Sequence, residues 1–570
     1  MMYSFMIVSY VLWVLLLIIY VDGLNVKVWK SNNENPLASD YPEKSILEKK
    51  TKTTNTAIGF SGGGSRAFTA AMGYLAGLRD LDLLKNVRYI GGISGGAWAA
   101  IVYTYVQNIS DDEIFLCSII SPENINYNNL QIMNTNCVRN LSSQEVIPIA
   151  INAWKNGIVD TIAESWSYAI SKVYLEPIGI LPNTRFSWDE TTVNEIKFRN
   201  KELLNETFLI PKNKNRPFLI IGTTLVGPSY GAPYTPDNRN YTLMEITPLY
   251  VGQLKNLDVT YNYSSIITSS TANNNNNNDN KNENEDKKDM IDGIKSSHVK
   301  HIGGIVEPYA FSRKGRAPLK SISSDVTSGI IHIPDPKIFL DLSFTAGTVS
   351  YAPGALFESF HGVAKPLSME FDYWSPSLES PESITMMYAD GGSYQNIPLI
   401  SFIQRKIPKI ILFFMSSIPL KPFEDWDVEN DSYSDDQITN DLSSYFGALS
   451  INRSYNFEDR SYELTKNQIF SQSDYITVIK GLQTAQQNGK GIIATFNLTT
   501  IENQWLGITA GISTEITFSY LGRLSKWESL LSKEMYSLVV PEENSTDLSN
   551  VISHGPFKSF PHYFTEGGKY

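Results

Sequence analysis

Two glycine-rich turns within residues 58–105 constrain this chain more than any other feature. The first is Ser-Gly-Gly-Gly-Ser-Arg-Ala at residues 61–67, and the second is Gly-Ile-Ser-Gly-Gly-Ala-Trp at residues 92–98. Each turn lies between a short apolar run and a segment with apolar residues at helical spacing. Glycines this dense are needed where backbone N–H groups approach a ligand closely or where φ is positive. The stretch therefore predicts a β-α-β-α unit of an α/β protein.

Ser94 lies at the second turn, at the tip of a predicted strand-to-helix connection. A serine in the pattern Gly-x-Ser-x-Gly is exposed above a sheet, with a helix N-terminus beside its oxygen. Its hydroxyl needs a base to take the proton, and the oxyanion that follows needs preorganised donors. Gly62, Gly63 and Gly64 offer successive backbone N–H groups at a helix start. Arg66 offers a cation for developing charge or for a substrate phosphate. The pattern favours a serine acyl hydrolase with Ser94 as the nucleophile.

The base is either a histidine or an aspartate. None of the six histidines lies in a motif-like setting; they are His298, His301, His332, His361, His554 and His562. Asp390 is the better candidate, because it follows a predicted strand at residues 384–389 and precedes two glycines. If that strand and the strand before Ser94 are parallel, both side chains project from one edge of the sheet. The sequence thus favours a Ser94–Asp390 dyad over a triad.

The rest of the chain fits one large catalytic unit. Almost continuous apolar runs at residues 218–222 and 409–414 predict buried central strands. Another strand is predicted at residues 329–333, and helical patterns occupy residues 145–175. We therefore predict an α/β fold over residues 56–540, a three-layer sandwich with a mostly parallel central sheet.

Three other segments are predicted to lie outside the packed core. Asparagine-rich residues 264–300 predict a disordered insertion, because they offer too little apolar surface to offset the entropy of ordering. Residues 25–55 are polar and are predicted to be a connector, and residues 541–570 a C-terminal tail.

The N-terminus predicts entry into the secretory pathway. Residues 5–21 are an uncharged run followed by small residues, which is typical of a signal peptide, here residues 1–24. The first four residues carry no Lys or Arg, so an uncleaved membrane anchor formed by residues 5–21 is the alternative. The chain has nine glycosylation sequons, but its many asparagines would give about eight by chance, so they do not decide the compartment. Cys117 and Cys137 would pair in an oxidising lumen or remain two thiols.

Composition also limits the partners. The net charge of -12 argues against a nucleic-acid partner. Two cysteines and six scattered histidines leave no zinc site, and nothing in the sequence calls for another metal or a cofactor.

Taken together, the motifs resemble the catalytic signature of the cytosolic phospholipase A2 and fungal phospholipase B (lysophospholipase) family. The resemblance is carried by residues 61–67, by residues 92–98, and by residues 390–399 with their Asp-Gly-Gly and Gln-Asn-Ile-Pro-Leu. Residues 244–250, Met-Glu-Ile-Thr-Pro-Leu-Tyr, and residues 346–350, Ala-Gly-Thr-Val-Ser, are similar to two further segments of the family. The Gln-Asn-Ile-Pro-Leu run makes the match specific to this branch rather than to patatin-like relatives.

The resemblance implies hydrolysis of fatty-acyl esters of glycerophospholipids or lysophospholipids through an acyl-serine on Ser94. It implies that Asp390 activates this serine without a histidine. Gly63 and Gly64 would form the oxyanion hole, and Arg66 would stabilise a phosphate or transition-state charge. Phospholipid aggregates or a membrane surface would be the partner.

The chain departs from the family in two places, and two other functions stay open. Ser65 occupies a position where the family has an aromatic residue, and Val349 interrupts a Gly-Thr-Ser-Ser stretch, so the pocket is expected to differ. The region before residue 56 is too short for a calcium-dependent C2 domain, so calcium dependence is not carried over. The alternatives are an acyl hydrolase of the same fold acting on galactolipids or neutral glycerides, and a catalytically inactive lipid-binding protein.

Overall fold

The computed structural model describes most of the chain. The described residues are 23–31, 36–48, 55–126, 138, 146–231, 240–264, 295–313, 315–323, 326–334, 336, 338–351, 369–434, 436–448, 466–489 and 491–539. The apolar run 5–21, the central part of the asparagine-rich segment and the tail 541–570 lie outside them.

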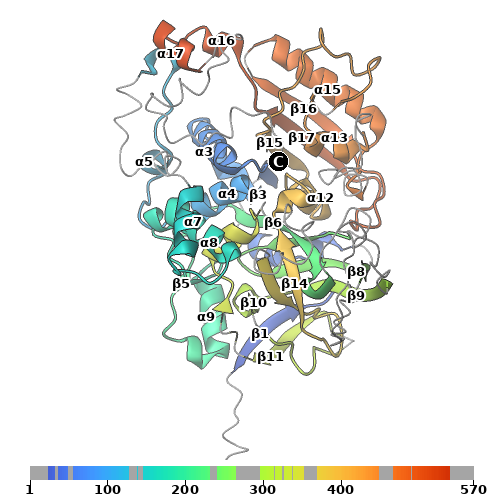
Figure 1. Ribbon diagram of the computed structural model, residues 1–570. Coiled ribbons are helices and arrows are strands. Elements are labelled where there is room, and N and C mark those ends of the chain that lie inside the picture. Colours follow the sequence, from blue (N-terminus) through green and yellow to red (C-terminus); the bar gives the residue numbers. More distant parts are fainter. Residues whose placement is uncertain are drawn as a thin grey trace, which may run out of the picture.

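Five parallel strands form the centre of one large sheet (Figure 1). In spatial order they are β6 (Phe218–Pro228), β3 (Val87–Gly92), β2 (Thr56–Phe60), β15 (Lys409–Phe414) and β17 (Ser513–Tyr520). Strand β6 is buried along its whole length, as expected for a strand covered on both faces. The predicted α/β fold with a parallel central sheet is confirmed.

Helices cover these strands from both sides (Figure 1). The helices α3 (Gly64–Asp80) and α4 (Gly95–Tyr105) follow β2 and β3, so the β-α-β-α unit has the predicted order. On the other side, Phe402 of α12 (Leu399–Gln404) packs close to Gly59 and Gly91 of the sheet. These glycines let α12 approach the strands closely, because a Cβ at Gly91 would lie 2.9 Å from the Phe402 ring.

Antiparallel strands extend the sheet beyond β6. Their order is β7 (Thr242–Ile246), β8 (Val251–Ser264), β9 (Lys295–Val306), β1 (Gly23–Trp29) and β11 (Ser328–Pro334). The strands β8 and β9 form a long hairpin whose outer ends, Ser264 and Lys295, flank the asparagine-rich segment. Residues 295–300 were predicted to belong to the insertion but pair with β8 instead, because ladder hydrogen bonds satisfy their backbone.

Residues 25–55 are not simply a connector. Strand β1 pairs with both β11 and β9, and its alternate side chains Leu24, Val26 and Val28 are fully buried in a second, smaller core. The polar composition of residues 25–55 predicted a connector, whereas the alternation of apolar residues at 24, 26 and 28 matches the period of a strand with one buried face. The boundary predicted after residue 24 therefore falls inside this strand.

The other described elements are helices, strands that join the large sheet, and two strands that pair in a separate small sheet. They include α2 (Glu43–Glu48), α5 (Asp112–Leu116), α7 (Val146–Lys155), α8 (Ile162–Ile170), the π-helical turn η5 (Ser171–Leu175), β4 (Arg185–Phe186), α9 (Glu190–Arg199), β5 (Phe208–Leu209), β10 (Ser312–Arg313), β12 (Ile338–Phe339), α10 (Leu342–Thr348), β13 (Met369–Tyr373), β14 (Ile384–Ala389), α13 (Asn440–Ser443), α15 (Gln472–Gln487), β16 (Ile492–Thr499), α16 (Ser525–Glu528) and α17 (Lys533–Val539). The strands predicted at 329–333, 384–389 and 409–414 are β11, β14 and β15, so these predictions are confirmed.

Two predictions about the ends and the cysteines concern residues outside the described part. Among the described residues, no helix is both long enough and apolar enough to cross a bilayer. Cys117 is disulfide-bonded, and Cys137, the other cysteine of the chain, lies outside the described residues.

Candidate active site

Ser94 occupies a strained turn between β3 and α4. Its φ of 50° and ψ of -125° are unusual for a residue with a side chain. The serine is the N-cap of α4, and its carbonyl oxygen accepts from Ala97 N at 2.9 Å. A nucleophile elbow has this geometry, because the sharp reversal of the chain lifts the side chain off the end of the strand.

The two glycine turns touch each other, and only glycines permit the contact. A Cβ on Gly95 would lie 2.0 Å from the carbonyl oxygen of Gly64, and a Cβ on Gly96 would lie 2.5 Å from that of Ser61. Both distances are far below van der Waals contact, and the atoms met are backbone atoms that have no rotamer to adjust. The glycines around Ser94 therefore serve the approach of the first turn as well as the elbow itself.

Asp390 reaches Ser94 by a route that differs from the one expected. Strand β14 pairs antiparallel with β6, with Ala389 opposite Thr224, whereas β3 pairs parallel with β6, with Gly92 opposite Ile221. Because β7 pairs with residues 221–225 along the other edge of β6, β3 and β14 share one edge. They run toward each other and end at the same place. The strand before Ser94 and the strand before Asp390 were expected to be parallel, and this expectation was wrong. The two strands run in opposite directions, and their facing ends bring the two side chains together.

A short hydrogen bond joins the two side chains. Ser94 Oγ donates to Asp390 Oδ2 at 2.7 Å, across a separation of 296 residues in the chain. Both residues are buried, with exposed fractions of 7% and 8%. The second carboxylate oxygen accepts from Gly392 N at 2.7 Å, and Thr224 Oγ1 donates to the Asp390 carbonyl at 2.9 Å. Thr224 thus holds the backbone of Asp390, and Gly392 N holds Oδ1 of the carboxylate while Oδ2 accepts from the serine.

The first turn leaves two of its three N–H groups available. Gly62 N donates to the backbone oxygen of Asn396 at 2.9 Å, so it is already bonded. Gly63, with φ of 133°, and Gly64, with φ of 60°, have conformations that favour glycine. Within the described residues, neither of their N–H groups donates a hydrogen bond. The N–H groups of Gly63 and Gly64 therefore differ from that of Gly62, which already has an acceptor.

Arg66 lies in the first turn of α3, beside this pair of glycines. Its Nη2 would be 2.8 Å from a Cβ on Gly63. Its buried Nε has no hydrogen-bond partner among the residues that the structure describes. Burial lowers the pKa of the Arg66 guanidinium, which an interaction with Tyr520 partly offsets. Among the described residues Arg66 has no carboxylate partner, and an arginine placed so beside two free N–H groups is suited to an anion.

An aromatic ring lies next to Ser65, although it comes from another part of the chain. Ser65 Oγ and Tyr174 Oη lie 2.7 Å apart, and the Tyr174 ring stacks on Trp98 with 4.9 Å between centroids. Tyr174 belongs to the π-helical turn η5, a kind of irregularity that is frequent at functional sites. At the position where the resembled family has an aromatic residue, this chain thus has Ser65 with the ring of Tyr174 beside it.

The segment 346–350 supports the site from behind. Trp98 Nε1 donates to the Ala346 carbonyl at 3.1 Å, and Gly391 N donates to the Val349 carbonyl at 3.2 Å. Segment 244–250 lies further away, where Glu245 holds Arg405 just after α12. The structure thus gives the first segment a place beside the serine and aspartate, and the second a place in the support of α12.

The described histidines lie elsewhere in the sheet. His298 and His301 are on β9, and His332 is on β11. His301 Nδ1 lies 2.8 Å from Asp258 Oδ1, and the Ser94 hydroxyl donates to Asp390. The other three histidines of the chain are outside the described residues.

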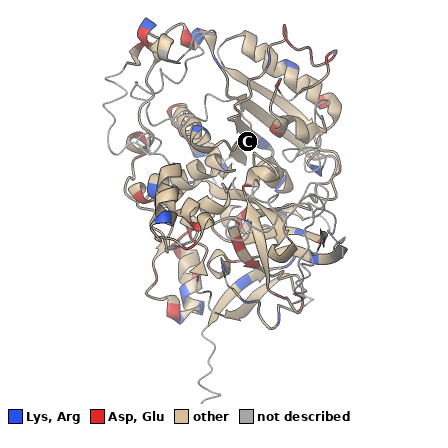
Figure 2. Cartoon of the chain, in the orientation of Figure 1, with Lys and Arg blue, Asp and Glu red and all other residues tan. Residues whose placement is uncertain are grey.

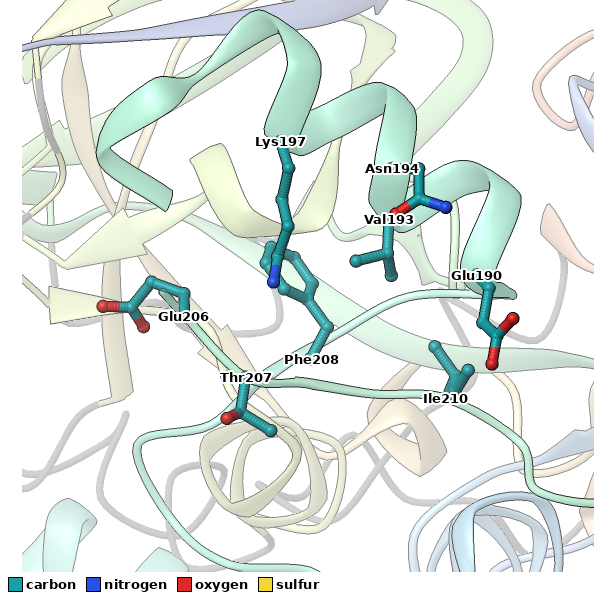
Figure 3. A pocket seen from close by; sticks show the side chains of 8 residues that line it. All are labelled: Glu190, Val193, Asn194, Lys197, Glu206, Thr207, Phe208 and Ile210. Atoms are coloured by element: carbon teal, nitrogen blue, oxygen red, sulfur yellow. The ribbon is translucent and has the colours of Figure 1, made fainter. Parts of the chain in front are cut away.

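A hollow with a volume of about 400 Å³ lies away from these residues (Figure 3). Side chains of α9 and of residues 206–210 line it, among them Lys197 and Phe208, and it contains none of the predicted site residues.

Lysines and arginines are interspersed with aspartates and glutamates along the ribbon rather than gathered on one element (Figure 2). Among the described residues, no group of three or more His, Cys, Asp or Glu side chains could hold a metal ion.

Sequence reasoning missed the role of two polar residues at the site. Thr224 lies inside an apolar strand, where nothing distinguishes it from any other buried threonine. Asn396 was noted only as part of Gln-Asn-Ile-Pro-Leu, yet it contacts the glycine turn 334 residues away. For Thr224 the available signal was a polar residue within an apolar strand, and for Asn396 it was the position shortly after Asp390.

The fold and site define a class: α/β proteins with a strained serine after a parallel strand, bonded to a carboxylate and facing a glycine turn. Comparison with known proteins agrees. Residues 59–298 match the family model of patatin-like phospholipases, "Patatin-like phospholipase". Residues 59–298 of the chain are thus similar to the patatin-like phospholipases.

Individual relatives match over short segments. Cytosolic phospholipase A2 zeta of Mus musculus is 55% identical over 38 residues, 7% of this chain and 4% of the relative. Cytosolic phospholipase A2 beta of Homo sapiens is 56% identical over 43 residues, 8% of this chain and 6% of the relative. The solved structure of human GIVD cytosolic phospholipase A2 is similar at 13% identity and a TM-score of 0.35, over 67% of this chain and 48% of that one. The chain thus spans less than a tenth of the curated relatives it matches and about half of this structure.

Proposed function

We propose that this protein is a serine acyl hydrolase that cleaves fatty-acyl esters of glycerophospholipids or lysophospholipids. The hydrogen bond of 2.7 Å between Ser94 and Asp390, in a buried site at a strained elbow, is the observation that carries the proposal. The match of residues 59–298 to a phospholipase family supports the lipid substrate.

In the first half of the reaction, Ser94 Oγ attacks the ester carbonyl carbon while Asp390 Oδ2 accepts its proton. The oxyanion that forms accepts hydrogen bonds from Gly63 N–H and Gly64 N–H. Asp390 then gives the proton to the leaving alkoxide oxygen as the C–O bond breaks, which leaves the acyl group on Ser94. In the second half, a water gives its proton to Asp390 and attacks the acyl-serine. The fatty acid departs, and Asp390 returns the proton to Ser94 Oγ.

Arg66 supplies charge stabilisation in this scheme. Its guanidinium has no acidic partner among the described residues, so a substrate phosphate or the developing oxyanion would be its counterion. A substrate without a phosphate would give Arg66 only the oxyanion as a counterion. For that reason we propose phospholipids as substrates rather than galactolipids or neutral glycerides.

The product profile of the purified protein tests the proposal. Wild type is expected to release fatty acid from lysophosphatidylcholine micelles and from phosphatidylcholine vesicles, and Ser94→Ala is expected to release none while remaining folded. Ser473→Ala, which changes an exposed serine on α15, is the matched control and should keep full activity. Full activity of Ser94→Ala would remove the nucleophile assignment. Activity only on galactolipids or glycerides would favour the first alternative, and a folded wild type that binds lipid without turnover would favour the second.

We further propose that the protein resides in the lumen of the secretory pathway or is secreted, with anchoring by residues 5–21 as the alternative. The sequon residues Asn108, Asn205 and Asn497 are exposed, as glycosylation requires. The matched relatives are named cytosolic, so the two sources of evidence point in different directions. Sensitivity of the expressed chain to endoglycosidase tests this proposal, and a cytosolic, unglycosylated product would overturn it.

A further inference from the structure

One side-chain amide joins the two halves of the candidate site. Asn396 belongs to the loop that starts at Asp390, and its two oxygens both accept from Gly62 N–H. The backbone oxygen lies 2.9 Å from that nitrogen and the side-chain Oδ1 lies 3.1 Å from it. Gly62 immediately precedes Gly63 and Gly64, whose N–H groups are free among the described residues. The loop of the base is therefore bonded to the turn of the oxyanion donors.

A second carboxylate fixes the direction of this amide. Asn396 Nδ2 donates to Asp441 Oδ2 at 2.7 Å, and Thr439 Oγ1 donates to the same oxygen at 3.0 Å. A carboxylate only accepts and a backbone N–H only donates, so the amide has one orientation that satisfies both neighbours. Turning it over would place Nδ2 against Gly62 N–H and Oδ1 against Asp441, and both bonds would be lost. Asp441 thus holds Oδ1 toward the glycine turn.

Space around the amide is as restricted as its hydrogen bonding. Oδ1 lies 2.2 Å from where a Cβ on Gly62 would be, and 2.9 Å from where a Cβ on Gly392 would be. The amide is therefore wedged between the oxyanion turn and the loop that orients Asp390. A turn of three glycines has more conformational freedom than other sequences, so its N–H groups stay aligned only if something outside the turn holds it.

We propose that Asn396, oriented by Asp441, is a positioning residue for the oxyanion hole. It occupies the N–H of Gly62 and so keeps those of Gly63 and Gly64 directed at the oxyanion. The inference rests on the proposed acyl-hydrolase function. Because these donors act on the transition state more than on the bound ester, the loss of Asn396 lowers kcat and leaves KM nearly unchanged.

The test uses the full-length protein and a soluble short-chain p-nitrophenyl ester, so the result does not depend on which lipid is the substrate. Asn396→Ala is expected to lower kcat by about 10- to 100-fold, since misplacing a catalytic group by an ångström costs about 100-fold. The Ki of an alkyl trifluoromethyl ketone, which forms an oxyanion on the serine, should rise by the same factor as kcat/KM falls. Asp441→Ala should reduce kcat less, by about 3- to 10-fold, and should have no further effect in the Asn396→Ala background.

A matched control separates positioning from general stability. Asn503 also holds backbone groups through its side-chain amide, bonding the carbonyls of Lys466 and Gln468 and the N–H of Leu506. Asn503→Ala should therefore lose stability while keeping kcat and the Ki of the ketone.

Three results would overturn the inference. The first is a folded Asn396→Ala with kcat within about twofold of wild type, and the second is a fall in kcat without the rise in Ki. If Asn396→Ala fails to fold, Asp441→Ala decides alone, and an unchanged kcat and Ki in that variant is the third. Failure of the proposed function would be seen in wild type itself, which would hydrolyse no ester, and the inference would fall with it.

Discussion

A buried charge cluster behind the site offers a sharp test of how this fold is stabilised. The Arg405 guanidinium donates to Glu43 Oε1 at 2.7 Å and to the two oxygens of Glu245 at 2.9 and 2.7 Å. It also donates to the Ser401 carbonyl at 2.8 Å and lies 3.9 Å from the centre of the Tyr41 ring. The side chains of the three charged residues are between 0% and 4% exposed. One cation therefore pairs with two carboxylates, and all three side chains are almost fully shielded from solvent.

Arg405→Met removes the cation and keeps most of the side-chain volume, so the cost is electrostatic rather than a cavity. Breaking a buried pair by removing one partner costs about 3–5 kcal/mol, against about 1 kcal/mol for an average substitution. Burial already raises the pKa of Glu43 despite the neighbouring arginine. Without Arg405 the folded-state pKa of Glu43 rises further above its unfolded value, so stability is lost as pH rises toward the folded-state pKa. The variant should therefore lose more stability at pH 8 than at pH 5.

Urea unfolding followed by tryptophan fluorescence at both pH values measures the effect. The control is the triple variant Arg405→Met, Glu43→Gln, Glu245→Gln, which removes all three charges and should recover most of the lost free energy of unfolding. A loss for Arg405→Met under about 1 kcal/mol at both pH values, or a larger loss at pH 5, would refute the reasoning.

Three further predictions use the same measurements. Ser94→Gly should be more stable than Ser94→Ala by about 1–2 kcal/mol, because glycine relieves the positive φ of the elbow; the usual order, with alanine more stable, would contradict the strain. Gly95→Ala should destabilise the fold by about 1–3 kcal/mol and lower esterase activity, because its Cβ would meet Gly64. Gly73→Ala, exposed on α3 with nothing within 4 Å, should instead stabilise by about 0.5–1 kcal/mol, and equal urea midpoints for the two variants would refute the packing argument. Burial raises the pKa of Asp341, the N-cap of α10, to about 6, so its contribution to stability is present below about pH 4 and lost as pH rises through 6. Asp341→Asn keeps the cap and should flatten that part of the stability profile, and identical profiles would contradict the shift.

Several local parts of this protein could be predicted from short sequence patterns. The glycine turns, the strand and helix order of residues 56–105 and the strands β11, β14 and β15 follow from patterns that span a few residues each. Backbone conformation at a glycine, and burial along an apolar strand, depend mainly on the residues themselves, which is why these predictions are confirmed.

How these parts meet depends on long-range strand pairing, which short patterns do not encode. The opposed ends of β3 and β14 on β6 bring Ser94 and Asp390 within 2.7 Å, and no local pattern encodes the direction of a strand relative to one 296 residues away. The same holds for β1. It pairs with β11, whose residues lie more than 290 positions later in the chain, and this pairing makes part of the predicted connector a strand of the sheet. Asn396 shows the limit most clearly, because its role depends on a glycine and a carboxylate that approach it only after the sheet has assembled. Sequence supplied the chemical groups of the glycine turn and the elbow, and long-range strand pairing set the distances between them.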